Sequence, residues 1–364
     1  MTLDGTPLLG SPTGVGTYVR GLGSALARRE DLSLTLSPLS LRAGAGSPAD
    51  LPLGARWLHR PAPAGVLRRT WARVAFPPGE WVHGRGEVFH GTNFVLPPLR
   101  RTAGVVTVHD LAYLRHRGTV HSSSLGHRRL VRAGLLRADA TLTVSRSVAG
   151  ELVAEYGLDP ATVTAIPLGV DPSWSRSRPL AEEDRLRLGL PERYLVFVGS
   201  REPRKNLAWL LRAHRQASAE SGDVPALVLC GPAGWGDQPD TSGARLTGYL
   251  PRPVLQQVVA GAQALVLPSR DEGFGLPVLE AFACGVPVIC TDLPVLQEVG
   301  GGLAGTVPVD DTDALADALL GAGRGAGRGA GPEAAKLLRR HAATFSWEDC
   351  AVRTAQVYHR VART

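Results

Sequence analysis

Lysine is almost absent from this sequence: Lys205 and Lys336 are the only two. Lysine and arginine together number 40 against 33 aspartates and glutamates, so arginine carries nearly all of the formal net charge of +7. An excess of arginine suits an anionic substrate or an acidic membrane surface. The arginine-rich runs at 99–101 and 127–132 contain no interleaved aromatic residues. Nucleic acid, whose bases stack on aromatic side chains, is therefore a disfavoured partner.

Cysteine is scarce, and long apolar runs are missing. The four cysteines form no CxxC pair and have no histidine at metal-ligand spacing: Cys230, Cys284, Cys290 and Cys350. We expect buried free thiols in a reducing cytosol. No run of ~18 apolar residues occurs, and the N-terminus lacks the basic and apolar regions of a signal peptide. These absences predict a cytoplasmic protein and leave open a peripheral contact with the inner face of the cell membrane.

Length and composition predict two folded α/β domains. A single core stops growing near ~250 to 300 residues, whereas this chain has 364 residues, of which 44% are hydrophobic and 20% charged. Short aliphatic runs, such as those at 194–200, 226–231 and 264–269, alternate with stretches that have apolar residues at helical spacing. Continuous apolar strands separated by helices indicate parallel sheets covered on both faces.

The boundary between the two domains is expected in the segment 169–184, which is rich in proline, serine and charge. We assign residues 1–172 to an N-terminal domain and residues 173–345 to a C-terminal domain. The helical pattern at 346–364 is expected to form a terminal helix that packs back on the N-terminal domain. The glycine and arginine repeat at 321–331 is expected to be a flexible surface connection.

Ligands of open α/β sheets bind at the carboxyl ends of the strands, so the loops there are candidate sites. The loop at 10–19 precedes a predicted helix and contains Gly14 and Gly16. Glycine lets backbone N–H groups approach a phosphate closely, and the helix N-terminus adds a favourable dipole. The G-x-G-x-x-G fingerprint of dinucleotide binding is incomplete, because Val19 stands in place of its third glycine. A simple tight turn is the alternative.

Charged side chains follow two other predicted strands. His109 comes after the strand that ends in VTV, where it suits a general base, a partner for a sugar hydroxyl or a structural histidine. Arg201, Arg204 and Lys205 come after the strand at 194–200. A compact ammonium beside a bidentate guanidinium suits a diphosphate, and solvated charge is the alternative.

Two glutamates interrupt the mostly apolar segment SRDEGFGLPVLEAFACGVPVICTD at 269–292. Pro277 fits the first position of a helix, which places Glu280 in the first helical turn. An acid there gains ~0.3 to 1 kcal/mol from the helix dipole. Glu272, in a loop of small residues, has no such structural explanation. Carboxylates that accept hydrogen bonds from vicinal hydroxyls would explain both positions.

Taken together, these motifs resemble those of the retaining glycosyltransferases of family 4. RDEGFGLPVLEAFACGVPVI resembles the E-x7-E segment of that family, TGVGTYV its glycine loop, VTVHD its active-site histidine and VGSREPRKN its phosphate loop. The match runs along essentially the whole chain in the right order. The resemblance implies a GT-B fold, in which two Rossmann-like parallel-sheet domains face a central cleft. The N-terminal domain would bind the acceptor and the C-terminal domain the nucleotide sugar.

The resemblance also implies roles for the residues of the E-x7-E segment. Glu280 would hold the ribose hydroxyls of the nucleotide, and Glu272 would lie by the transferred sugar. The backbone amides of Phe274, Gly275 and Leu276 would contact sugar and phosphate.

The remaining motifs receive roles in the same way. Lys205 and Arg204 would bind the diphosphate and stabilise it as the leaving group. Gly14 and Gly16 would contact the donor from the other side of the cleft, and His109 would contact the sugar near the reacting carbon.

The predicted activity is a retaining hexosyl transfer, with mannose favoured, from a GDP- or UDP-linked sugar to a hydroxyl of a glycan, lipid-linked or small-molecule acceptor. The acceptor is expected to contact the loops at 91–102 and 115–124. We recognise no metal motif of the DxD type and expect neither a metal nor a further cofactor, because Lys205, Arg204 and helix N-termini can neutralise the leaving group.

Three other functions compete with this prediction. The first is a non-catalytic nucleotide-sugar-binding subunit of a glycan assembly complex. The second is a phosphorylase or an epimerase on a similar scaffold, although a glycogen-type phosphorylase needs a lysine for pyridoxal phosphate and a much longer chain. The third, a nicotinamide dehydrogenase, is disfavoured by the incomplete glycine fingerprint.

Overall fold

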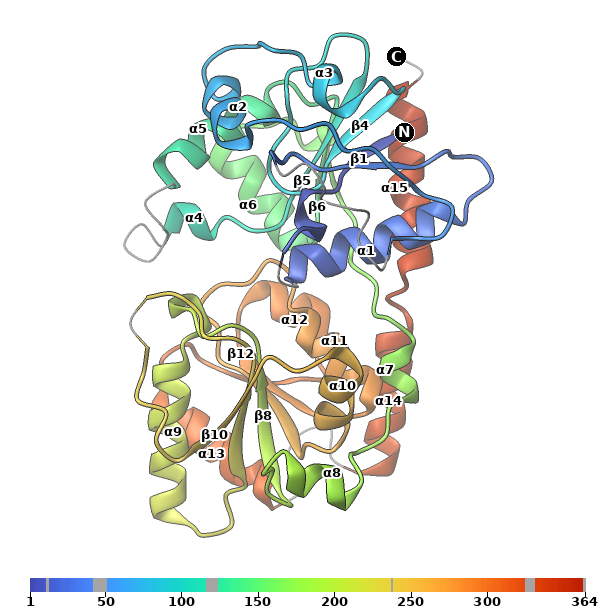
Figure 1. The fold of residues 1–364 in the computed structure, drawn as a ribbon. Coiled ribbons are helices and arrows are strands. Elements are labelled where there is room, and N and C mark those ends of the chain that lie inside the picture. The colour runs from blue at the N-terminus through green and yellow to red at the C-terminus, as the bar shows by residue number, and fades with distance from the viewer. Residues whose placement is uncertain (11–12, 42–50, 116–123, 237, 325–330, 363–364) are drawn as a thin grey trace. The chain divides into compact units, whose positions relative to one another are not determined.

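The computed structural model describes residues 1–10, 13–41, 51–115, 124–236, 238–324 and 331–362. It divides the chain into two compact units (Figure 1). Unit 1 consists of Met1–Gly169 and Ser346–Thr364, and unit 2 of Val170–Phe345. The boundary between the two units therefore falls after Gly169, slightly before the domain boundary at residue 172 expected from the sequence.

Unit 1 is built on one parallel sheet. Within its described residues the sheet has seven strands in the order β3-β2-β1-β4-β5-β6-β7, and all neighbours run parallel. The strands are β1 (Thr2–Asp4), β2 (Thr35–Ser37), β3 (Arg56–Trp57), β4 (Val88–Gly91), β5 (Ala103–Val108), β6 (Ala140–Thr143) and β7 (Val163–Ala165). The direction in which strands are added reverses between β1 and β4, as in dinucleotide-binding sheets.

Helices connect these strands and cover the sheet. They are the 3-10 helix η1 (Thr6–Leu8), α1 (Gly14–Ala27), α2 (Ala64–Trp71), α3 (Glu80–His83), α4 (Ala112–Arg115), α5 (Ser124–Leu135), α6 (Arg146–Tyr156), the 3-10 helix η2 (Pro160–Thr162) and the terminal helix α15 (Trp347–Ala362).

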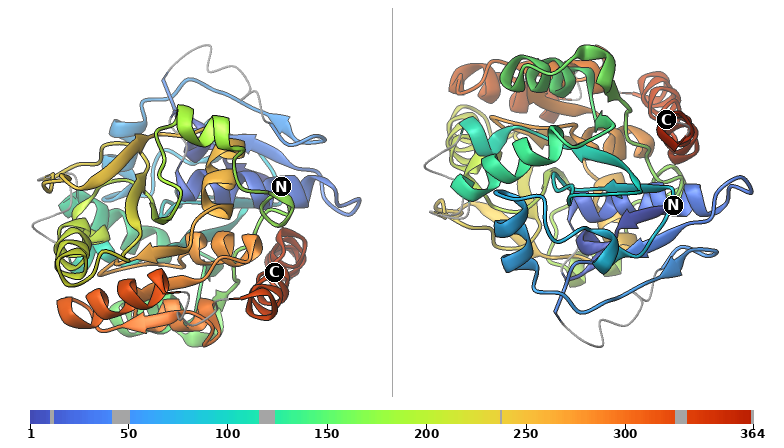
Figure 2. Two further views of the ribbon diagram at one scale, coloured as in Figure 1. Left: turned by 90° about the horizontal axis from the view of Figure 1, so that it is seen from below. Right: turned by 90° about the horizontal axis from the view of Figure 1, so that it is seen from above.

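The terminal helix α15 packs beside α1 in unit 1 (Figures 1 and 2). The two helices approach closely at Gly21, where an added Cβ would lie 2.2 Å from the ring of Trp347. The hydroxyl of Tyr358 lies 2.6 Å from Nδ1 of His90, at the end of β4, and both side chains are buried. The last residues of the chain therefore complete the core of unit 1.

Unit 2 repeats the same architecture. Among its described residues the sheet order is β10-β9-β8-β11-β12-β13, again with parallel neighbours throughout. The strands are β8 (Tyr194–Val198), β9 (Ala226–Cys230), β10 (Ala244–Gly248), β11 (Ala264–Leu267), β12 (Val288–Thr291) and β13 (Gly305–Val307). The reversal lies between β8 and β11, so that ligands are expected at the carboxyl ends of these two strands.

The helices of unit 2 are α7 (Ser173–Arg176), α8 (Glu182–Arg187), the 3-10 helix η3 (Pro203–Lys205), α9 (Leu207–Glu220), α10 (Arg252–Ala260), α11 (Leu276–Cys284), α12 (Pro294–Gly300), α13 (Thr312–Gly323) and α14 (Pro332–Ala343). Helices follow most strands of unit 2, whereas α7 and α8 precede β8, and β10 follows β9 without a helix among the described residues.

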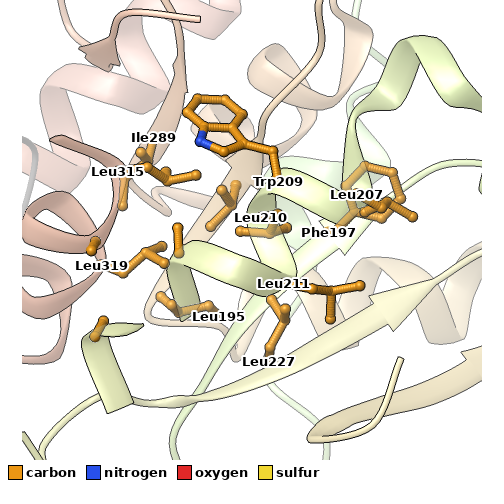
Figure 3. Packing of buried hydrophobic residues seen from close by; sticks show 14 of the residues in the cluster. Leu195, Phe197, Leu207, Trp209, Leu210, Leu211, Leu227, Ile289, Leu315 and Leu319 are labelled. Carbon is orange, nitrogen blue, oxygen red and sulfur yellow. The ribbon is translucent and has the colours of Figure 1, made fainter. Parts of the chain in front are cut away.

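One part of the core of unit 2 lies between its sheet and the helices α9 and α13 (Figure 3). Trp209 and Leu210 of α9 are fully buried there and pack with strand residues such as Leu195 and with Leu319 of α13. Burial of one such side chain contributes ~1.5 to 3 kcal/mol. This apolar packing fixes α9, and with it the loop that precedes α9.

Three expectations from the sequence can be compared with the fold. All four cysteines are buried free thiols, as predicted. The repeat at 321–331 is not wholly a connection, because residues 321–323 form the end of α13, while 325–330 lie outside the described residues. No helix in the described part of the chain is long and apolar enough to cross a membrane.

Candidate functional site

The candidate site lies in unit 2, at the carboxyl ends of β8 and β11. The loop after β8 contains η3 and ends at Asn206, and the loop after β11 contains Glu272. The reversal of strand order between β8 and β11 opens this edge of the sheet to a ligand. Both loops had been singled out from the sequence, and the sheet order brings them together.

Lys205 and Glu272 form a buried ion pair at this edge. The Lys205 Nζ lies 2.6 Å from Oε1 of Glu272, and the two side chains are only 9% and 7% exposed. The hydroxyl of Ser269 donates a second hydrogen bond of 2.6 Å to the same oxygen. An ionised carboxylate is costly to bury, and pairing of this kind offsets that cost.

Arg204 contacts the same carboxylate from the other side. Its Nη1 lies 3.3 Å from Oε2 of Glu272 and 3.2 Å from the carbonyl oxygen of Asp271, and its Nη2 lies 2.8 Å from Oε1 of Glu202. Glu202 in turn accepts a hydrogen bond from Nε1 of Trp235. An ammonium and a guanidinium therefore stand side by side, each held by a carboxylate, with the Arg204 side chain still 25% exposed.

The charges of this cluster determine the protonation of Glu272. Burial by itself raises the pKa of this carboxyl, but the positive charges of Lys205 and Arg204 and the hydrogen bond from Ser269 outweigh burial and lower the pKa to about 2. Glu272 is thus ionised at neutral pH.

Backbone amides complete the site at the N-terminus of α11. The helix begins at Leu276, and Gly275 precedes it with a φ of +90°. At Gly275 an added Cβ would lie 2.5 Å from Leu296, so only glycine fits this turn. Among the described residues the N–H groups of Phe274, Gly275 and Leu276 have no acceptor. Such amides, together with the dipole of the helix, favour an anion.

Glu280 lies farther along α11 than the sequence suggested. The helix begins one residue before Pro277, at Leu276, so Glu280 falls in the second turn and the helix dipole does not account for it. Its partly buried carboxylate has no hydrogen bond or ion pair with any described residue. Burial raises its pKa to about 7, even though Arg252 acts in the opposite direction. A carboxylate left without partners at such a cost is typical of a binding site.

In unit 1 the predicted histidine stands at the end of β5. The Nε2 of His109 lies 2.8 Å from the carbonyl oxygen of Thr92, and Tyr18 packs edge-on against the ring at 5.0 Å. Burial lowers the pKa of His109, so the imidazole is neutral. Because Nε2 carries the proton that is donated to Thr92, Nδ1 is left as an acceptor for a hydroxyl.

The glycine loop of unit 1 is a helix start. The α1 helix begins at Gly14, not after it, because Thr13 is the N-cap and its hydroxyl accepts a hydrogen bond of 3.0 Å from the amide of Gly16. The Gly16 amide is therefore already used. An added Cβ on Gly16 would lie 2.9 Å from the carbonyl oxygen of Pro7, whereas Gly14 is exposed with open space around it.

Several residues at this edge of the sheet were not predicted from any sequence motif. Ser269 lies two residues beyond the end of β11, at the start of the segment that contains the two glutamates. Its position at a strand end was the available signal. Arg270 and Asp310 are joined by an ion pair, with Nη2 of Arg270 2.9 Å from Oδ1 of Asp310. They come from loops far apart in the sequence, and no spacing rule relates them.

The expectation that the sequence contains no D-x-D motif was wrong, because Asp311, Thr312 and Asp313 form one. Oδ1 of Asp311 accepts a hydrogen bond from the amide of Ala314 and thereby caps α13, and Asp313 accepts one from the side-chain amide of Gln216. These contacts are structural. No group of three or more His, Cys, Asp or Glu side chains that could hold a metal ion is found in the part of the chain that the structure describes.

Two protein-family models match the sequence. The model described as Glycosyltransferase Family 4 matches residues 12–174, most of unit 1 and the first residues of unit 2. The model described as Glycosyl transferases group 1 matches residues 192–322, which contain the candidate site.

Two solved structures share the fold. Sucrose-phosphate synthase from Thermosynechococcus elongatus has a TM-score of 0.75 and 21% identity, with 99% of this chain and 98% of that chain covered. The Anabaena protein HepE in complex with UDP-glucose has a TM-score of 0.71 and 16% identity, with coverages of 99% and 98%. The two parallel-sheet units and these neighbours confirm the prediction of a GT-B fold.

Curated relatives are more similar in sequence. The D-inositol 3-phosphate glycosyltransferase of Salinispora arenicola is 32% identical over 61% of this chain and 54% of its own length. The O-antigen chain mannosyltransferase B of Escherichia coli is 31% identical, and the match covers 74% of each chain. With models of both halves matched in order and a relative matched over most of its length, the chain belongs to family 4 of the glycosyltransferases.

Proposed function

We propose that this protein transfers a hexose from a nucleoside diphosphate sugar to a hydroxyl of an acceptor, with retention of anomeric configuration. One observation carries the proposal. Lys205, Arg204 and the amides at the N-terminus of α11 gather cationic and N–H donor groups at the edge of the sheet where ligands bind. A diphosphate is the ligand that fits these groups.

In the proposed reaction the bond from the anomeric carbon to the diphosphate oxygen breaks, and a bond to the acceptor oxygen forms. Negative charge then grows on the departing diphosphate. Lys205 and Arg204 stabilise this charge without having to reorganise, because their carboxylate partners already hold them in place. The acceptor hydroxyl loses its proton to an oxygen of the departing phosphate, and attack occurs from the face that the diphosphate leaves.

The remaining carboxylates bind hydroxyls in this proposal. Glu280, which has no protein partner among the described residues, accepts hydrogen bonds from the ribose, and Glu272 accepts one from the sugar. His109 accepts a hydrogen bond from a sugar hydroxyl through Nδ1. Arginine and lysine can act on the diphosphate without a divalent ion, so we propose a metal-independent reaction.

Mannose is the proposed sugar, with GDP-mannose as donor. The support is the name of the Escherichia coli relative, a mannosyltransferase. UDP-hexoses are the alternative, since the solved neighbour HepE is in complex with UDP-glucose. For the acceptor we retain a glycan, lipid-linked or small-molecule hydroxyl, and contact with a membrane surface stays a prediction.

The proposal is tested by incubating the purified protein with GDP-mannose, GDP-glucose, UDP-glucose and UDP-N-acetylglucosamine, and measuring release of the nucleoside diphosphate. Slow release from one donor even without an acceptor is expected, because water can replace the acceptor. A non-catalytic nucleotide-sugar-binding subunit would instead bind a donor and leave it intact after prolonged incubation, and that result would refute the enzyme assignment.

The pKa of Glu280 predicts opposite effects of Glu280→Gln on binding and on stability. At pH 8 the variant should bind the nucleoside diphosphate more weakly, because a charged acceptor of ribose hydrogen bonds is lost. The wild type should itself bind more weakly as the pH falls through about 7, where Glu280 becomes protonated. Calorimetric titration at pH 6 and pH 8 measures both effects, and an affinity independent of pH and of the substitution would exclude the ribose role.

Stability should change in the other direction. The folded-state pKa of about 7 lies above the usual 4.5, so the folded protein binds the extra proton between these values and loses stability as the pH rises through that window. At pH 8, Glu280→Gln should therefore unfold at a higher temperature than the wild type, and the difference should vanish near pH 4.5. Thermal unfolding in the absence of ligand measures this difference.

A further inference from the structure

Two residues other than glycine have left-handed backbone conformations on the loops of unit 2. Asn206, directly after Lys205, has a φ of 55°, and Asp310, after β13, has a φ of 66°. Such a conformation costs roughly 1 to 2 kcal/mol in a residue with a Cβ, although Asn and Asp tolerate it best. The side chains of these two residues are bonded to each other, with Nδ2 of Asn206 2.9 Å from Oδ1 of Asp310.

Arg270 joins the same pair to the loop of Glu272. Its Nη2 lies 2.9 Å from Oδ1 of Asp310 and its Nε lies 3.1 Å from Oδ2, so that the guanidinium is bidentate. The backbone amide of Arg270 donates a hydrogen bond of 2.9 Å to the carbonyl oxygen of Arg204. Asp310 thus ties together the loop that ends in Lys205 and Asn206 and the loop that leads to Glu272.

Neither the side chain of Asn206 nor that of Asp310 caps its neighbouring helix. Asn206 is the N-cap of α9, yet its side chain accepts no hydrogen bond from the helix. The cap of α13 is the adjacent Asp311, whose side chain accepts from the amide of Ala314. The left-handed backbone of Asn206 ends η3, where its N–H donates to the carbonyl oxygen of Pro203. This local role uses the backbone alone and leaves the contact between the two side chains unexplained.

Stability does not explain the arrangement either. The side chains of Arg270 and Asp310 are 44% and 45% exposed, and ion pairs so exposed typically contribute ~0 to 1 kcal/mol. That contribution is smaller than the combined conformational cost of two left-handed residues. Backbone conformations of this kind persist mainly where function requires them.

We propose that Asn206, Asp310 and Arg270 form a positioning cluster, which holds the Lys205 ammonium and the Glu272 carboxylate in the geometry that receives the diphosphate. Asn206 acts through its covalent bond to Lys205, and Arg270 acts through the loop that carries Glu272. The inference rests on the proposed function of this edge. It adds to that function three residues that are proposed to control turnover through the geometry of Lys205 and Glu272.

Glycine substitutions separate positioning from stability. Asn206→Gly and Asp310→Gly remove the side chains while relieving the backbone, because glycine adopts a positive φ freely. If the bond between Asn206 and Asp310 only stabilised the fold, both variants should have a lower Tm and unchanged turnover. Positioning predicts an unchanged or higher Tm together with a loss of kcat of about 10- to 100-fold, while the KM of the donor rises by no more than about 10-fold. The double variant should lose no more than Asp310→Gly, because that substitution already removes the bond to Asn206 together with the ion pair to Arg270.

Asp311→Ala is the matched control. It removes the cap of α13 at the neighbouring position, so that it should lower Tm and leave kcat unchanged. Arg270→Lys should retain more activity than Arg270→Ala, because it keeps one bond to Asp310. Wild-type kcat in Asn206→Gly, or an equal loss of kcat in Asp311→Ala and Asp310→Gly, would overturn the inference.

Binding of inorganic pyrophosphate gives a readout that does not depend on turnover. Calorimetry should show about 10-fold weaker binding of pyrophosphate to Asn206→Gly and Asp310→Gly than to the wild type, and unchanged binding to Asp311→Ala. If the wild type turns over no donor, the proposed function fails while this titration still tests the cluster. Equal pyrophosphate affinities in all four proteins would refute the cluster alone.

Discussion

Lys205→Ala is expected to lower kcat by about 10³-fold, the loss seen when one donor to a developing negative charge is removed. Lys205 is the cation held closest to Glu272, with Nζ 2.6 Å from its carboxylate, and it lies at the strand end where the diphosphate is proposed to depart. Arg204 remains in the variant, so that binding of the donor should weaken less than turnover. The measurements are kcat and the KM of the donor at saturating acceptor.

The controls for this prediction come from the chain itself. Lys336, the other lysine, is exposed and paired with Glu333 on α14, so Lys336→Ala should leave turnover unchanged. Lys205→Arg keeps a positive charge and should recover part of the activity. Turnover of Lys205→Ala within a factor of about three of the wild type would sink the leaving-group role, because a lost donor to a developing charge costs far more than that.

Glu272→Gln should impair both turnover and folding. The substitution leaves the Lys205 ammonium buried with a neutral neighbour, and breaking a buried ion pair on one side costs ~3 to 5 kcal/mol. The side chains of Lys205 and Arg204, freed from Glu272, should also move toward solvent. We therefore expect kcat to fall by about 10²-fold or more, because the two cations are misplaced. Thermal unfolding and kcat measure the two effects, and an unchanged kcat in a folded variant would exclude Glu272 from the reaction.

The pH dependence of thermal stability separates the contribution of the Glu272 charge from the contribution of its packing. The pKa of Glu272 is lowered from 4.5 to about 2, so the stability that its charge contributes is fully present above pH 4.5 and is lost as the pH falls toward about 2. The difference in Tm between wild type and Glu272→Gln should therefore narrow across that window. A difference that stays constant down to about pH 2 would show that packing, not charge, holds the loop.

The pairing of Lys205 with Glu272 follows from rules that the sequence makes accessible. Both residues lie in the loops that follow apolar runs, and the ends of parallel strands meet at one edge. The order of the strands, which places β8 beside β11, is a tertiary property, but the alternation of strands and helices already predicted the type of sheet. The ion pair itself depends only on these two loops lying next to each other.

Other features depend on backbone conformations that side-chain patterns do not reveal. The helix α11 starts at Leu276 because Gly275 before it is left-handed. Glu280 therefore lies in the second turn and not in the first turn, where Pro277 had suggested that the helix dipole accounts for it. The bond between Asn206 and Asp310 joins residues 104 positions apart, each with a positive φ. No periodicity relates such residues.

The start of α1 is a different case, because a local signal was present. Thr13 precedes Gly14 and Gly16, and threonine is a preferred N-cap residue, so the helix could have been started at Gly14 from the sequence. The glycines drew the interpretation toward a loop instead. The structure shows that the amide of Gly16 is bonded within the cap.

The central claim is that the edge of unit 2 at β8 and β11 binds a diphosphate through Lys205 and Arg204. Titration of nucleoside, nucleoside monophosphate and nucleoside diphosphate into the wild type and Lys205→Ala by calorimetry tests it most directly. The account predicts that the second phosphate increases affinity by about 10-fold or more in the wild type and adds little in the variant. Equal affinities for monophosphate and diphosphate in the wild type would contradict it.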